Sequence, residues 1–486
     1  MKNVMLKTLT LPVLLTLLVA GCSLDSPDHP SGVEAPPVFS SYVAIGNSLT
    51  SGYMDSGLMK AGQTTSYPRL IAGQLGLDVA DFSQPWVDTP GIGSTDTGDP
   101  GLVAGVLRFD GASISPLGVT ADTEVPGLLL AATQPTPYHN LGVPGITLGD
   151  VFSAISSVQS ESNSPFLDFI NRVSLYGNEE RSAFVLDAVG QPTEATYQTA
   201  SVGWQAIAKG PTLATMWAGN NDVLGGATGG NPTTANMTDP NVFAARYSST
   251  MQLLAGGLTA RTGFAPTIVV ANIPGVTGAA YFLSEATFNE ALAAQTEGAL
   301  TAWPGGYEEG SAELLTFTVL SWVAANIGNP ATPIPSNYTL TAGEVTLVEQ
   351  YVGGYNQAIE QVKEAINASG AAQVAVVDAN AIFDSLDAAQ KTHFMLLLPA
   401  MGGNVEMAAA TTIFSLDGVH PNNHGYGIVA NAFIDAINGL LETEVPHVDT
   451  TALTWDPTYG VPVGGKMGDR PMMSPEVAAS LTAIWQ

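Results

Sequence analysis

Apolar and polar positions follow two different periods along this chain. Five short, nearly continuous apolar runs each end in or near Gly, Asn or Asp, and they lie at residues 41–48, 138–145, 211–222, 266–275 and 371–380. Elsewhere apolar residues recur every three to four positions, as in residues 241–260 and 344–366. The short runs predict buried strands and the longer period predicts helices. Strands that alternate with helices pair in parallel and are covered on both faces. The sequence therefore predicts a three-layer α/β/α sandwich around a central, mainly parallel five-stranded sheet.

Polar turns follow the first three of these runs, and the first turn carries a serine. The run at 41–48 ends in Gly46-Asn47-Ser48 before a segment of helical character begins. Functional groups gather beyond the carboxyl ends of parallel strands, so Ser48 is predicted at the edge of the sheet. A serine hydroxyl needs an adjacent base to become a nucleophile, and that base is usually an imidazole oriented by a carboxylate.

One of the six histidines has a carboxylate at a useful spacing. Asp417 and His420 lie in one loop that can present both side chains to the same space, with one ring nitrogen left to face Ser48. A helix expected over 423–441 would hold this loop on the sheet. His424 has two interpretations, a substrate contact or an ordinary residue at the start of that helix, and the second is favoured. The other histidines, without such a partner, are His29, His139, His393 and His447.

Attack on an ester also needs donors for the negative charge that develops on the carbonyl oxygen. Three groups at predicted strand ends are candidates: the backbone N–H groups of Ser48 and Gly145, and the side-chain amide of Asn221. A glycine at position 145 lets the main chain approach a substrate closely. Asp222, beside Asn221, is predicted to hydrogen-bond within its own turn rather than to contact substrate.

Four short blocks carry these residues: Gly46-Asn47-Ser48-Leu49, the turn at Gly145, Gly219-Asn220-Asn221-Asp222 and Asp417-Gly418-Val419-His420-Pro421. In this order they resemble the four conserved blocks of the SGNH (GDSL) hydrolases, lipases and esterases with a flavodoxin-like fold. The resemblance implies that Ser48 is the nucleophile, His420 the base and Asp417 its orienting partner. It also implies that Ser48, Gly145 and Asn221 form an oxyanion hole. Asn47 departs from the family's usual Asp, and the connections between blocks are longer than in compact members.

The extra length is expected within one enlarged hydrolase domain, residues 40–445, because no linker divides it. Residues 84–136 are rich in Gly, Pro, Thr and Asp and are predicted to form a long surface excursion. A second excursion, 276–340, contains the apolar run 314–323. That run has two interpretations, a wall or lid for an acyl chain or an extra core helix, and the core helix is favoured. Residues 393–403 are a further apolar candidate for lining the cleft.

Both ends of the chain are predicted to lie outside the hydrolase domain. Residues 1–21 carry two lysines, a leucine-rich run and small residues, the pattern of an export signal. Leu-Val-Ala-Gly before Cys22 resembles the bacterial lipobox, which implies cleavage there and acylation of the thiol; an ordinary secretory signal is the alternative. The serine that follows resembles lipoproteins sorted to an outer membrane, so a location at that membrane or the cell surface is expected. Residues 22–39 are expected to form a flexible tether, and residues 446–486 an extension packed on the domain.

Composition narrows the partners and cofactors. The chain has 14 Lys and Arg against 43 Asp and Glu, a formal net charge of −29, so nucleic acid is an unfavourable partner because phosphate binding needs clustered cations. Cys22 is the only cysteine, and the domain is therefore predicted to have no disulfide and no thiolate metal site. No residues have metal-ligand spacing, and no cofactor is expected.

Together these features predict a cell-envelope serine ester hydrolase of the lipase or esterase type. Its substrate would be a small-molecule or lipid acyl ester, cleaved through a Ser-His-Asp triad and an acyl-enzyme, and its membrane contact would be the lipid anchor. One alternative is a carbohydrate O-acetylesterase of the same fold. A second alternative, from a different class, is a surface-binding lipoprotein without turnover, because a fold alone does not establish activity.

Overall fold

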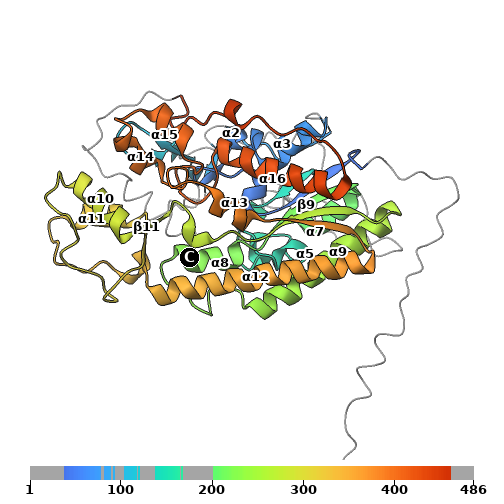
Figure 1. The fold of residues 1–486 in the computed structure, drawn as a ribbon, viewed down its shortest axis with the longest axis horizontal. Coiled ribbons are helices and arrows are strands. Elements are labelled where there is room, and N and C mark those ends of the chain that lie inside the picture. The colour runs from blue at the N-terminus through green and yellow to red at the C-terminus, as the bar shows by residue number, and fades with distance from the viewer. Residues whose placement is uncertain are drawn as a thin grey trace, which may run out of the picture. The chain divides into compact units, whose positions relative to one another are not determined.

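A computed structural model of the chain (Figure 1) describes residues 38–77, 81–88, 91–93, 103–104, 106–117, 119–120, 137–164, 166–167 and 201–460. The predicted export signal, Cys22 and nearly all of the predicted tether lie outside these residues, as do residues 461–486. Within the described part of the chain, no helix has the length and apolar composition needed to cross a membrane.

Five parallel strands form the central sheet, in the order β14-β10-β9-β1-β8. They are β1 (Tyr42–Gly46), β8 (Asn140–Gly142), β9 (Leu213–Trp217), β10 (Thr267–Ala271) and β14 (Gln373–Val377). Each lies within one of the five predicted apolar runs, so these strand predictions are confirmed. β1, β9 and β10 are buried at every position, as expected of strands covered on both faces.

Long helices cover the two faces of this sheet (Figure 1). On one face α9 (Pro240–Thr262) packs against α12 (Ala342–Ser369) and α7 (Val202–Lys209). On the other face α16 (Asn423–Leu441) packs against α3 (Tyr67–Gln74). The predicted α/β/α sandwich is therefore confirmed, and α16 has the bounds that its apolar period predicts.

Local capping residues fix where these helices begin. Asp239 accepts hydrogen bonds from backbone N–H groups in the first turn of α9, and Pro240 is the first residue of that helix. Thr341 and Glu344 form a capping box at the start of α12. The side chain of Asn422 accepts a hydrogen bond from the Gly425 N–H at 3.0 Å, which fixes the start of α16 directly after the predicted Asp-His loop.

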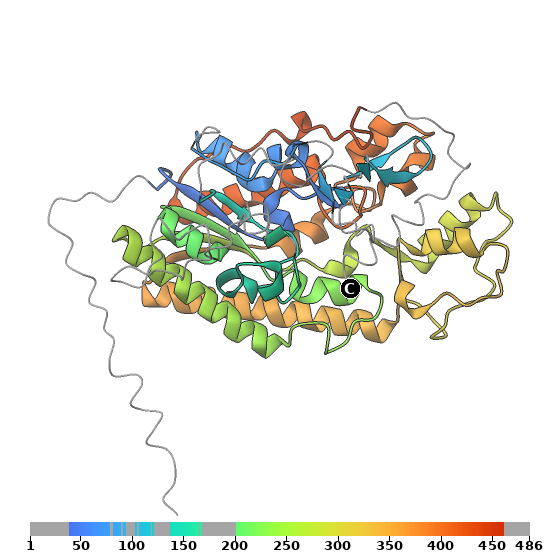
Figure 2. The same cartoon turned by 180° about the vertical axis from the view of Figure 1, so that it is seen from behind.

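The second predicted excursion has a small core of its own. β11 (Phe282–Ser284), β12 (Leu314–Thr316) and β13 (Thr339–Leu340) form an antiparallel sheet beside α10 (Glu285–Gln295) and α11 (Val319–Asn326). Figure 2 shows these elements grouped beyond the end of the central sheet. Most side chains of the run 314–323 are buried within this group. The core interpretation of that run is therefore correct, although its first residues form the strand β12 and only Val319–Val323 belong to the helix α11; none of the run lines the cavity described below, so the wall interpretation is wrong.

The described part of the first excursion is not confined to the surface. β5 (Leu107–Phe109) and β6 (Ile114–Pro116) form a hairpin whose Leu107, Phe109 and Ile114 side chains are buried. The Phe109 ring meets the Phe394 ring edge-on, with 5.4 Å between centroids. The Leu107 N–H donates to the carbonyl oxygen of Asp55 at 2.7 Å. The surface prediction is therefore wrong for this hairpin, because its apolar side chains pack into the protein.

The remaining described elements are short. They are α1 (Ser48–Ser51), α2 (Lys60–Thr64), α5 (Asp150–Ser153), α8 (Asn221–Thr228), α13 (Ala379–Ser385), α14 (Phe394–Ala400), α15 (Val405–Thr411), β2 (Gly57–Leu58), β3 (Ile92–Gly93), β4 (Val103–Ala104), β7 (Val119–Thr120) and the 3-10 turns η2 (Ser157–Gln159), η4 (Val276–Gly278), η5 (Ser336–Tyr338) and η6 (Thr450–Ala452). Residues 446–460 pack against α16, where the Asn431 side chain bonds both the N–H and the C=O of Val448.

Candidate active site

The turn after β1 places Ser48 at the carboxyl edge of the sheet. β1 ends at Gly46, and Ser48 is the first residue of α1. Asn47 caps this helix: its Oδ1 accepts a backbone N–H two residues on, and its Nδ2 donates to Oδ1 of Asn220 at 3.1 Å. A Cβ on Gly46 would lie 2.4 Å from the Trp217 carbonyl oxygen, so only glycine permits this close approach of β1 to β9.

Ser48, His420 and Asp417 form one hydrogen-bonded chain, although 372 residues separate the serine from the histidine. Nε2 of His420 lies 2.8 Å from Oγ of Ser48, and Nδ1 lies 3.1 Å from Oδ2 of Asp417. All three residues are buried. Because Nδ1 faces a carboxylate, we assign the ring proton to Nδ1, which leaves Nε2 to accept the serine hydroxyl proton. The structure thus brings together the three residues that the sequence predicts.

Asp417 is held ionised by its surroundings. Burial would raise its pKa, but the electrostatic interaction with His420 and hydrogen bonds from His420 and Ser56 outweigh this effect and lower the pKa to about 2. Oδ1 accepts the N–H groups of Val419 and His420 at 2.9 and 2.8 Å, and Oδ2 accepts the Ser56 N–H at 2.8 Å. A carboxylate with these donors can orient His420 and stabilise an imidazolium.

The loop that carries Asp417 and His420 is fixed at its tip and on one side. Gly418 has a φ of 73°, and a Cβ there would lie 2.9 Å from the Tyr281 backbone nitrogen, so the loop requires glycine at this position. The Tyr281 N–H donates to the Gly418 carbonyl oxygen at 2.8 Å. The ring of Tyr53 lies against the His420 ring, with 4.6 Å between centroids. The second excursion, which carries Tyr281, therefore supports the loop of Asp417 and His420.

The three predicted oxyanion donors lie at the start of α1 (Ser48), in the turn after β8 (Gly145) and at the start of α8 (Asn221). Within the described residues, neither the Ser48 N–H nor the Gly145 N–H donates to a protein acceptor. Asn221 Nδ2 donates one hydrogen to the Ile146 carbonyl oxygen at 2.8 Å, which leaves its second hydrogen available. Asn221 lines the same cavity as Ser48 and His420, whereas Gly145 does not line it. Gly145 instead lies in the turn that Asn221 holds, with a φ of 84°.

Two polar residues of the Gly219–Asp222 block behave differently from the prediction. Asp222 does not bond only within its own turn: its Oδ2 accepts the Leu148 N–H at 2.8 Å and so ties α8 to the turn that follows Gly145. The prediction that Asp222 bonds within its own turn is therefore wrong, since its side chain reaches the segment that follows β8, two strands away in the sheet. Asn220 was not singled out by sequence reasoning, yet it lines the cavity and pairs with Asn47. The sequence feature that could have marked Asn220 is its position in the Gly219–Asp222 block.

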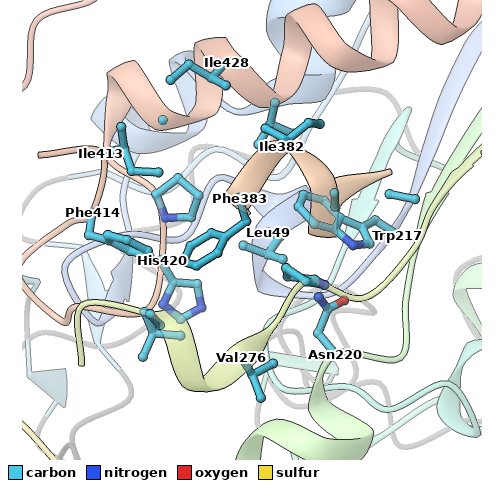
Figure 3. Close-up of a pocket in the computed structure, with 18 of the residues that line it drawn as sticks. Leu49, Trp217, Asn220, Val276, Ile382, Phe383, Ile413, Phe414, His420 and Ile428 are labelled. Atoms are coloured by element: carbon cyan, nitrogen blue, oxygen red, sulfur yellow. The ribbon is translucent and has the colours of Figure 1, made fainter. Parts of the chain in front are cut away.

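An apolar cavity opens beside the triad (Figure 3). Figure 3 shows His420 and Asn220 on its polar side and aliphatic and aromatic side chains around the rest. The apolar wall comes from the ends of β9, β10 and β14, from α13 and from α16, with Leu49, Val276, Ile382, Phe383, Leu386, Ile413, Phe414, Ile428, Val429 and Phe433 among the lining residues. Such a surface suits the hydrocarbon part of a small molecule rather than a charged one.

The cavity wall differs from the predicted one. Neither the run 314–323 nor the segment 393–403 lines it, and only residues at the start of the second excursion, Val276 and Ala279, contribute. The segment 393–403 contains α14, whose Phe394, Met395, Leu397 and Leu398 are buried outside the cavity, so its predicted place in the cleft is wrong. Sequence reasoning missed α13, although Ile382, Phe383 and Leu386 have helical spacing after the last strand.

The other described histidines have structural surroundings. Nδ1 of His424 lies 3.2 Å from the Thr450 carbonyl oxygen, as expected of a residue that holds the start of α16 to the C-terminal segment. His393 is buried and stacks on Phe317, with 3.7 Å between ring centroids. Within the described residues, no group of three or more His, Cys, Asp or Glu side chains is arranged to hold a metal ion.

Comparison with known proteins gives one match. A family model described as GDSL-like Lipase/Acylhydrolase matches residues 42–433, which includes every residue of the triad and of the predicted oxyanion hole. The comparison with curated proteins gave no match to an individual relative. The matched residues begin with β1 and end within α16, so they enclose the whole central sheet.

Proposed function

Because the chain belongs to the GDSL-like lipase/acylhydrolase family, whose members hydrolyse esters, we propose that it is a serine carboxylic ester hydrolase with Ser48 as nucleophile. The observation that carries this proposal is the unbroken contact from Ser48 Oγ through His420 to Asp417. A serine and a histidine at 2.8 Å, with a buried ionised carboxylate behind them, form the arrangement that activates a hydroxyl.

The proposed reaction proceeds in two halves. Ser48 Oγ attacks the acyl carbonyl carbon while His420 Nε2 takes the hydroxyl proton and Asp417 stabilises the imidazolium. The tetrahedral oxyanion receives hydrogen bonds from the Ser48 and Gly145 N–H groups and from Asn221 Nδ2. Collapse breaks the ester bond, and His420 returns the proton to the leaving alcohol. A water molecule, deprotonated by His420, then attacks the acyl-enzyme and releases the carboxylic acid, which restores the Ser48 hydroxyl.

We propose acyl esters with a hydrocarbon chain as the preferred substrates. The support is the apolar lining of the cavity next to Ser48 and His420, where each buried methylene contributes about 0.8 kcal/mol. An acetyl group would leave most of this wall unused, so the same wall disfavours the alternative of a carbohydrate O-acetylesterase. The intact triad contacts likewise disfavour a binding lipoprotein without turnover.

We also propose that the protein is exported and held at the membrane by acylation of Cys22. This proposal comes from the N-terminal sequence alone. Cys22→Ser should release the protein from the membrane fraction of expressing cells, whereas unchanged retention would contradict the anchor. Membrane binding through the body is disfavoured, since a net charge of −29 repels anionic lipid.

The central test compares wild type with Ser48→Ala on p-nitrophenyl esters of graded chain length. Wild type should hydrolyse them with kcat/KM rising as the acyl chain lengthens, and Ser48→Ala should lose nearly all activity. A fluorophosphonate should label Ser48 in wild type alone. Ser369→Ala, which changes an exposed serine at the end of α12, is the matched control and should behave as wild type. Absence of both hydrolysis and labelling in wild type would refute the proposed function.

A further inference from the structure

A buried carboxylate lies behind the triad, in a turn that the sequence did not mark. Asp55 follows α1 with a φ of 52° and is fully buried. Its backbone N–H donates to Oγ of Ser415 at 3.0 Å, and the next N–H, of Ser56, donates to Oδ2 of Asp417 at 2.8 Å. The turn that follows the nucleophile is therefore bonded directly to the loop that carries the acid and the base.

The Asp55 side chain holds the peptide unit next to Asp417. Its Oδ1 accepts the Leu416 N–H at 2.7 Å. The Leu416 carbonyl oxygen lies 3.0 Å from Nε2 of His393, which is the donor because Nδ1 of the same ring accepts the Met395 N–H. Burial lowers the pKa of His393 to about 4, so this histidine stays neutral. Leu416 is thus held through both its N–H and its C=O, one residue before Asp417.

The other carboxylate oxygen of Asp55 binds the C-terminal segment. Oδ2 accepts the Trp455 Nε1–H at 3.1 Å and the Tyr459 hydroxyl at 2.5 Å. The Phe109 N–H donates to the Pro457 carbonyl oxygen at 2.7 Å, which fixes the same segment to the β5–β6 hairpin. Residues 455–459 lie beyond residue 433, where the match to the family model ends. One side chain therefore links this additional segment to the catalytic loop.

The geometry points to Asp55 as a positioning residue that transmits the packing of residues 455–459 to the Asp417–His420 loop. This inference rests on the proposed function, since its effect is the alignment of His420 with Ser48. The Leu416 and Trp455 N–H groups can only donate, whereas the Tyr459 hydroxyl can also accept. A proton on Asp55 is therefore accommodated only if the Tyr459 hydroxyl turns round, and one of the three donors to the carboxylate is then lost.

The ionisation of Asp55 falls in the pH range where the triad would work. Burial raises its pKa to about 7, although hydrogen bonds from Tyr459 and Leu416 oppose the rise, and the charge of Asp417 adds to it. Two further titratable groups beside this site are Tyr459 and Tyr426, and burial raises the pKa of both, so they stay neutral. All three donors are therefore engaged only when the pH exceeds the pKa of Asp55.

The test compares full-length wild type with Asp55→Asn and Tyr459→Phe, using p-nitrophenyl butyrate from pH 5 to 9. Both variants should lower kcat at pH 8 by roughly tenfold with little change in KM, because a misplaced catalytic group affects the reaction rather than ground-state binding. On the acid side of the pH profile, log kcat/KM should fall with a slope greater than one in wild type, where two groups bind protons. In Asp55→Asn, where one group remains, the slope should be one. Asp449→Asn, which removes the charge of an exposed N-cap residue in the same C-terminal segment but leaves an amide oxygen to cap the turn, is the control and should match wild type.

The outcomes separate this inference from the proposed function. If wild type is active and labelled at Ser48 by a fluorophosphonate, but both variants keep its kcat and acid-limb slope, the positioning role is overturned while the hydrolase stands. If wild type is neither active nor labelled, both proposals fall. Thermal unfolding shows which variants are folded. Should Asp55→Asn fail to fold, Tyr459→Phe decides the question alone, because it removes only one hydroxyl from a half-buried ring.

Discussion

His420 and His424 lie one helical turn apart in sequence, and their contacts give them different roles. His420 bonds Ser48 and Asp417, whereas His424 faces a backbone carbonyl of the C-terminal segment. His420→Ala should lower kcat/KM by roughly 10⁴-fold or more while the protein stays folded, because the general base is lost. His424→Ala is the matched control and should stay within a few-fold of wild type. If both substitutions lowered kcat/KM equally with the same ester, the assignment of His420 as the base would be wrong.

Asn47 tests whether an amide suffices where the family usually has an acid. Its Oδ1 caps α1 and its Nδ2 donates to Asn220. Asn47→Ala removes the cap and should lower the free energy of unfolding by about 1 to 2 kcal/mol and reduce kcat, since α1 carries Ser48. Asn47→Asp keeps the cap, and a flip of the Asn220 amide restores the second bond, so this variant should retain activity. Urea unfolding with ester assays measures both effects, and a large loss in Asn47→Asp would contradict the flip.

At the scale of residues, the contacts among Ser48, His420 and Asp417 are predictable from the sequence, whereas the groups that support them are not. Ser48 and the Asp417–His420 pair lie in short blocks whose order and spacing are visible in the sequence. Asp55 and His393 have no such local signal, because their partners are Leu416 and the C-terminal segment, contacts that exist only after folding. Asp222 was misread for the same reason, since its acceptor oxygen meets an N–H from another strand end.

Among the elements, α13 forms the part of the cavity wall that best tests acyl binding. Phe383 lies half-buried on α13, and its ring packs edge-on against Phe414 with 5.8 Å between centroids. Phe383→Ala should raise KM for long-chain p-nitrophenyl esters roughly tenfold or more and barely change it for the acetate, because lost apolar contact weakens binding of the chain alone. Ile327→Ala, at an exposed apolar residue directly after α11, is the control. Equal effects on both esters would contradict an acyl site here.

A helix or strand is predictable from sequence when its own apolar pattern is clear, and less so when contacts with distant residues fix it. The five central strands lie in nearly continuous apolar runs that end in polar turns, and α16 has a long, regular apolar period, so local sequence predicts them. α13 and the β5–β6 hairpin are short, and their apolar residues are fixed by partners elsewhere, such as Phe414 for Phe383 and Phe394 for Phe109. The run 314–323 was ambiguous because apolar character alone does not distinguish a cavity wall from a separate core.

For the whole molecule, buried acids and buried histidines affect stability with opposite signs. Burial raises the pKa of Asp55 to about 7 and of Asp222 to about 6, from an ordinary value of 3.8, so the folded protein holds protons that the unfolded chain releases. This pair makes stability fall as pH rises from about 4 to 7. Burial lowers the pKa of His139 to about 3 and of His393 to about 4, from 6.5, so the unfolded chain gains protons that the folded protein does not. This pair makes stability rise over nearly the same range.

The free energy of unfolding should therefore change little between about pH 4 and 6. At pH values under about 4 it should decrease, because protons bound by the histidines of the unfolded chain and protonation of Asp417, whose folded pKa is about 2, both favour unfolding. Asp55→Asn removes one of the balancing acids. Relative to wild type, its free energy of unfolding should decrease by about 1.4 kcal/mol for each unit by which pH is lowered from 7 towards 4, because wild type alone gains stability as Asp55 binds its proton. Urea unfolding at each pH gives both curves, with Ser369→Ala as a control that should parallel wild type. Parallel curves for Asp55→Asn and wild type would mean that Asp55 keeps an ordinary pKa, and the pH-dependent part of the positioning role would then be lost, leaving only its hydrogen bonds.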